Sequence, residues 1–146
     1  MQPNRILPDL QCSLVCQDVR QEANGNLILI GIMQFIPVPE TPIAAAQLLV
    51  FNRWAAGVGQ FSDTVRLIAP DQTTVVAKSD LKFGLQHAHA CATNVNVLRN
   101  VEFKTPGVYF IEVLVDDVLK LRYPLPVAVP QKQAPTPGAP PPPTTQ

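Results

Sequence analysis

Charged residues are scarce in this chain: Asp, Glu, Lys and Arg make up 15% of its 146 residues, against about 25% in typical soluble domains. The 11 basic and 11 acidic residues give a formal net charge of zero, and Lys and Arg are scattered singly along the sequence. Nucleic-acid binding usually needs a basic stripe. The sequence therefore predicts no nucleic-acid partner, and the low charge indicates that some apolar surface faces a protein partner.

Long apolar runs are also lacking. No stretch of about 18 apolar residues occurs, so no transmembrane helix or membrane insertion is predicted. The first residues, MQPNRILPDLQ, have no charged start followed by an apolar run, so no signal peptide is predicted. We therefore expect a cytoplasmic protein whose cysteines are reduced.

Cysteine is rare as well, with three in the chain. On one straight strand, Cys12 and Cys16 would lie about 13 Å apart. A disulfide requires Cα atoms within about 7 Å. We therefore interpret both residues as small buried hydrophobes.

What the chain does contain is β-strand pattern. Apolar residues alternate with polar ones in several stretches, such as LQCSLVCQDV, and no convincing amphipathic helix occurs. Turn signals separate these stretches at Asn24-Gly25, Pro70-Asp71, Pro106-Gly107 and Asp116-Asp117. The pattern predicts an all-β fold, a two-sheet antiparallel immunoglobulin-like sandwich of about seven to eight strands.

Two aromatic residues fit this prediction. Tyr109 follows a Pro-Gly turn, as in the tyrosine corner of immunoglobulin-like domains. We expect Trp54 to anchor the core, with a role as a binding hot spot as the alternative.

The predicted domain covers residues 1–129, and residues 130–146 form a separate tail. This tail, PQKQAPTPGAPPPPTTQ, carries no large apolar residue. It is therefore expected to be disordered, with polyproline II character. It serves as a solubilising segment or linker, or alternatively its run Pro140 to Pro143 docks into an SH3-like or WW-like groove.

Three stretches carry a resemblance to a known family: CQDVRQEANGNLILIGI, DTVRLIAPDQ and TPGVYFIEVLVDD. Over about Leu10 to Val127 the chain resembles an uncharacterised bacterial family of small β-sandwich proteins. The resemblance implies the fold and a bacterial cytosolic setting. It implies no activity and no functional residues.

The stretch QHAHAC holds the candidate metal ligands His87, His89 and Cys91. If it is a strand, these three side chains share one face, and the two imidazoles could chelate zinc or copper. Cys91 would join only through a bulge. A further ligand would come from Cys12, Cys16, Asp80 or water, none of them near in sequence. The alternative is an ordinary edge strand without metal.

No catalytic signature is present: the chain lacks G-x-S-x-G, H-E-x-x-H, P-loop and Rossmann patterns. A Cys–His dyad would need Cys12 or Cys16 to lie across the sheet from His87 or His89, which the sequence leaves open. We therefore predict no enzyme and no required cofactor. The main hypothesis is a protein-binding or structural module that meets a protein partner or a copy of itself through an apolar surface or sheet edge. The alternative is a metal-binding protein.

Overall fold

The computed structural model describes residues 5–130, and within them the chain forms nine β-strands. The predicted tail lies outside the described residues, apart from Pro130. No helix in residues 5–130 is long and apolar enough to cross a membrane. The strands are β1 (Asp9–Gln21), β2 (Leu27–Ile32), β3 (Ile36–Pro37), β4 (Ile43–Ala55), β5 (Gly59–Ile68), β6 (Val75–Leu85), β7 (Cys91–Phe103), β8 (Gly107–Val115) and β9 (Val118–Ala128).

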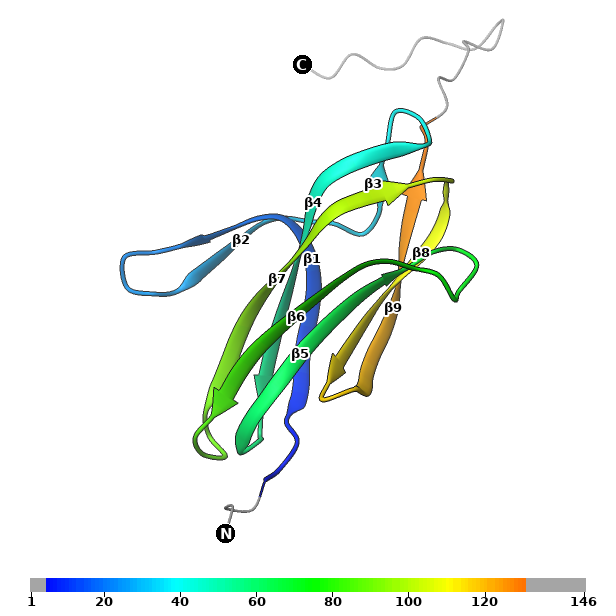
Figure 1. Cartoon of the computed structure of the whole chain (residues 1–146). Coiled ribbons are helices and arrows are strands. Elements are labelled where there is room, and N and C mark those ends of the chain that lie inside the picture. The colour runs from blue at the N-terminus through cyan, green and yellow to red at the C-terminus, as the bar shows by residue number, and fades with distance from the viewer. Residues whose placement is uncertain (1–4, 131–146) are drawn as a thin grey trace, which may run out of the picture.

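Two sheets pack face to face (Figure 1). The first sheet has the strand order β2-β1-β4-β7, and the second has the order β3-β9-β8-β5-β6. The all-β, two-sheet prediction is confirmed. The prediction of purely antiparallel sheets with seven to eight strands is wrong, because the two-residue strand β3 pairs in parallel with β9 at Ile36↔Val127 and Pro37↔Ala128. β3 ends at the first proline of PVPETP, and a two-residue strand beside prolines gives no alternation for the sequence to reveal.

The Asn-Gly turn predicted between the first two strands is present. Gly25 has φ +93°, a conformation that favours glycine, and its N–H donates to the Glu22 carbonyl at 2.9 Å. The Asn24 side chain accepts a bond from the Asn26 N–H at 3.0 Å. These local bonds fix the β1–β2 hairpin, which runs to one side of the sandwich in Figure 1.

Two other predicted turns also join strands. In the β5–β6 turn, hydrogen bonds from the Thr74 hydroxyl and from the Thr74 and Thr73 N–H groups lower the pKa of Asp71 to about 2. In the β8–β9 turn, Asp116 and Asp117 have φ +46° and +66°, and aspartate is one of the few side chains that tolerate this region. Both hairpins therefore lie where the turn residues predict them.

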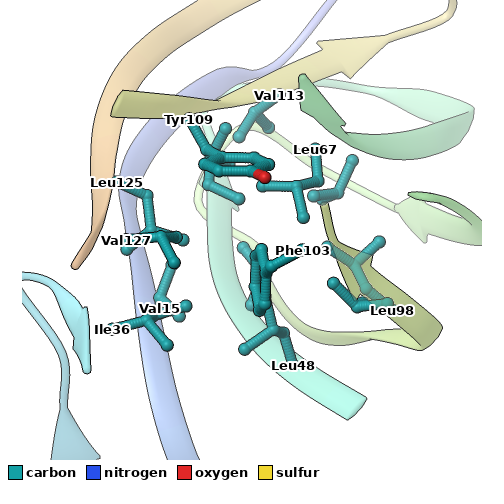
Figure 2. Packing of buried hydrophobic residues seen from close by; sticks show 14 of the residues in the cluster. Val15, Ile36, Leu48, Leu67, Leu98, Phe103, Tyr109, Val113, Leu125 and Val127 are labelled. Carbon is teal, nitrogen blue, oxygen red and sulfur yellow. The ribbon is translucent and has the colours of Figure 1, made fainter. Parts of the chain in front are cut away.

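The core lies between the sheets (Figure 2). Tyr109 from β8 meets the ring of Phe103 from β7 edge to face, with centroids 5.1 Å apart. Its hydroxyl donates to the Thr105 carbonyl at 2.8 Å. This is the bond expected of a tyrosine corner, so the interpretation of Tyr109 is confirmed. Trp54 is fully buried and stacks on Phe83 across the sandwich at 5.7 Å, so Trp54 is a core anchor.

A hydrogen bond links the sheets where β1 approaches β9. The hydroxyls of Ser13 and Tyr123 lie 2.9 Å apart. Burial raises the pKa of Tyr123 to about 12, and the bond with Ser13 opposes this effect in part. The neutral phenol is therefore the form that the folded protein favours.

This raised pKa predicts a loss of stability in alkali. The unfolded tyrosine ionises near pH 10, whereas the folded one keeps its proton to about pH 12. Ionisation therefore favours the unfolded state, and the free energy of unfolding falls as pH rises between these values. We expect the free energy of unfolding to fall by about 3 kcal/mol across this window through Tyr123 alone. Urea unfolding at several pH values measures it. A Tyr123→Phe variant should show a correspondingly shallower decline, and an unchanged slope would contradict the assignment.

Candidate functional site

The histidine-rich stretch is a loop. Residues 86–90 connect β6 of the second sheet to β7 of the first, and Cys91 is the first residue of β7. The Ala90 N–H donates to the His87 carbonyl at 3.0 Å, which closes a turn. The prediction that QHAHAC is a strand is therefore wrong, because the chain must leave one sheet and enter the other within five residues.

The loop places its three candidate ligands in solvent. His87, His89 and Cys91 are all exposed, and the two imidazole centroids lie 6.4 Å apart. Nδ1 of His87 accepts a bond from the His89 backbone N–H at 3.3 Å. Within residues 5–130, no three His, Cys, Asp or Glu side chains are arranged to hold a metal ion.

Two of the other proposed ligands, Cys16 and Asp80, are engaged elsewhere. Cys16 is buried against Leu49, and burial, followed by the charge of Asp18, raises the pKa of its thiol. The Asp80 carboxylate accepts a bond from the Thr64 hydroxyl at 2.5 Å. The zinc or copper site therefore stays a prediction, and the Cys–His dyad stays an open alternative.

A zinc titration tests the metal prediction. Two exposed imidazoles without a third ligand predict weak binding only, so native mass spectrometry at equimolar zinc should show mainly the metal-free chain. A stoichiometric adduct that disappears in His89→Ala would contradict this expectation and restore the metal site.

A cluster that the sequence did not reveal lies between the sheets. Asp63 on β5 is fully buried, and its carboxylate accepts four side-chain N–H donors from the opposite sheet. The donors are Asn52 Nδ2 at 3.0 Å, Trp54 Nε1 at 2.9 Å, Asn94 Nδ2 at 3.0 Å and Asn96 Nδ2 at 3.1 Å. We call these five residues the Asp63 cluster.

The Asp63 cluster holds the two sheets together. A buried carboxylate is costly unless several hydrogen bonds replace its water, and here β4 and β7 supply them to β5. The Oδ1 atom of Asn96 accepts a hydrogen bond from the Ser79 hydroxyl at 3.1 Å. Only the Oδ1 atom of Asn52 is buried without a partner in the described cluster. With no solvent access, Asp63 cannot reach a substrate, so we assign it a structural role.

Replacing the Asp63 carboxylate predicts a large loss of stability. Asp63→Asn would set an NH₂ group against the N–H donors of the cluster and leave buried donors unpaired. We expect a loss of about 3–5 kcal/mol in the free energy of unfolding, measured by urea denaturation. The matched control is Asp117→Asn in an exposed turn, expected to change stability by less than about 0.5 kcal/mol. A loss below about 1 kcal/mol for Asp63→Asn would contradict the assignment.

The surface feature that stands out is the β1–β2 hairpin, residues 17–32, which we call the arm. Up to Cys16, β1 pairs with β4, and beyond it β1 pairs with β2 alone. One set of arm side chains is half-buried against Leu49 and Phe51 on the outer face of the first sheet: Val19, Leu27 and Leu29. Another set is exposed, at 42%, 36% and 54%: Ile28, Ile30 and Ile32.

The surface of residues 5–130 includes the following open clefts. One, of about 540 Å³, is at the sandwich end beside Pro70 and Thr105. The other, of about 680 Å³, lies between the arm tip and the first sheet, where Phe51 and Arg53 line it.

The fold defines a class, an all-β protein of two packed sheets. Residues 11–128 match the model of a family of unknown function, DUF6941. This match covers most of the chain, so the chain belongs to that family. No curated protein matches it. The resemblance seen in the sequence is thus confirmed.

Proposed function

We propose that this chain is a non-enzymatic protein-binding module with an immunoglobulin-like sandwich, and that it pairs with a second copy of itself through the free edge of β2. The observation that carries the proposal is the composition of that edge. β2 ends the first sheet, carries three exposed isoleucines, and has neither charge nor proline.

The strand order supports the immunoglobulin-like description. The order β1-β4-β7 in one sheet and β9-β8-β5-β6 in the other corresponds to A-B-E and G-F-C-C′ in immunoglobulin domains. The tyrosine corner of Tyr109 lies near the start of the strand equivalent to F. On this correspondence β2 is an addition to the sandwich, and such additions are natural places for function.

A comparison of the sheet edges singles out β2. Native edge strands are usually protected by charge, proline or short length, because unpaired N–H and C=O groups invite another strand. β3 is two residues long, contains Pro37 and covers only the end of β9, whose remaining edge carries Pro124 and Pro126. β7, the other edge of the first sheet, carries Arg99 and Glu102. β6 carries Lys78 and Lys82. Within the described residues β2 lacks all these protections, and it lies on the arm, which runs to one side of the sandwich (Figure 1).

A second copy suits this edge. Two identical antiparallel strands form an isologous interface, in which the same patch serves both partners. Pairing centred on Ile30 sets Ile28 of each copy opposite Ile32 of the other, so the exposed isoleucines of the two copies pack side by side on one face of the joined sheet. Because β2 is uncharged, no like charges meet across this pairing. The four-stranded first sheet would then continue through both copies.

A charge at the centre of β2 should separate the copies. We expect the wild-type chain to dimerise at micromolar to millimolar concentration in analytical ultracentrifugation. Ile30→Lys should raise the dissociation constant at least about tenfold, because each dimer would set two ammonium groups opposite each other.

The matched control is Val108→Lys, which changes an exposed valine on the second sheet, 45% exposed. This variant should dimerise as the wild type does. A monomeric wild type across the concentration range would refute the proposal, and so would equal loss in both variants. Circular dichroism checks that both variants fold.

A further inference from the structure

The outer face of the second sheet gathers cations that are far apart in the sequence. Alternate residues of β5 point into the core, where Val65 and Leu67 are fully buried, so Arg66 between them points outward. The strand registers place Lys78 beside Arg66 on one side, Glu112 on the other, and Arg122 beyond Glu112. We call this line of four residues across four strands the charged row.

One carboxylate serves two arginines in the charged row. Glu112 accepts an ion pair from Arg66 at 2.9 Å and lies 4.0 Å from Arg122. Its two oxygens are therefore taken. A guanidinium has five N–H donors, so both arginines keep free donors.

On the β6 side of Arg66, the neighbouring charge is repulsive. Lys78 and Arg66 are direct cross-strand partners, and like charges opposite each other destabilise a sheet. Asp80 lies 3.7 Å from Lys78 but reaches only that side of the pair. An incoming carboxylate between Lys78 and Arg66 would relieve the repulsion and add charge-assisted hydrogen bonds.

Apolar groups border the charged row. The Arg122 guanidinium lies over the Phe110 ring, 4.4 Å from its centroid, which holds the arginine side chain against the sheet. Val108 and Leu119 are exposed on β8 and β9. Such a mixture of cations and apolar side chains fits a protein segment better than a phosphate backbone, which needs an extended basic surface.

We infer that the charged row is a binding surface for an acidic protein segment, with a carboxylate held between Lys78 and Arg66. The surface lies on the second sheet, so it is separate from the β2 edge on the first and is available in monomer and dimer alike. Charge complementarity argues for this partner, because the face presents Lys78, Lys82, Arg66 and Arg122 against two carboxylates, Asp80 and Glu112.

A hexaglutamate peptide is the probe, with hexaglutamine as its neutral counterpart. In a titration followed by ¹⁵N NMR at low salt, hexaglutamate should bind saturably and shift amides of β5, β6, β8 and β9. Arg66→Gln and the more exposed Lys78→Gln should each weaken this binding at least about tenfold. The matched control is Arg99→Gln, an exposed arginine on β7 of the first sheet, which should bind as the wild type does.

Three results would overturn the inference. They are no saturable binding of hexaglutamate, equal weakening in Arg99→Gln, or equally tight binding of oligothymidylate, which would indicate a general anion surface. Ile30→Lys should still bind the peptide, so failure of the dimer and failure of this surface are distinguishable. If Arg66→Gln does not fold, Lys78→Gln decides alone, because Lys78 lies on the surface with 54% of its side chain exposed.

Discussion

The carboxylate of Asp63 is the point on which the sandwich depends. It comes from the second sheet, and all four of its side-chain donors come from β4 and β7 of the first. Apolar packing alone tolerates small sliding between layers, whereas four directional hydrogen bonds to one buried charge fix a single arrangement. The position of β5 relative to β4 and β7 is thereby fixed, and Trp54 is held where it stacks on Phe83.

Because this cluster fixes the body of the sandwich, we expect function in the arm and on the outer faces of the sheets. The arm departs from the sandwich after Cys16, where β1 loses β4 as a neighbour. The charged row depends on the body in another way, because Lys78, Arg66 and Glu112 come together only through the registers of β6, β5 and β8. Both proposed surfaces therefore follow from backbone pairing that the core imposes.

Sequence reasoning reached the fold through local signals. The Asn24-Gly25 turn, the paired aspartates before β9 and the position of Tyr109 each have a physical cause within a few residues, and each is found in the structure. The strand interpretation of QHAHAC failed because the alternation of its residues is equally compatible with a loop. No local sequence signal marks Asn94 and Asn96 as buried, because their partner, Asp63, lies 31 residues before Asn94. The charged row could not be predicted from the scattered cations either, because the spacing of residues along the sequence does not show which residues pair across strands.

The central claim is that β2 is the edge at which one copy meets another. Hydrogen exchange of backbone amides at low and high protein concentration tests it most directly, because strand pairing protects N–H groups that are otherwise open to water. The account predicts that amides of Leu27–Ile32 exchange more slowly at high concentration, while those of β6, an edge of the second sheet, do not change. Exchange in β2 that is independent of concentration would contradict it.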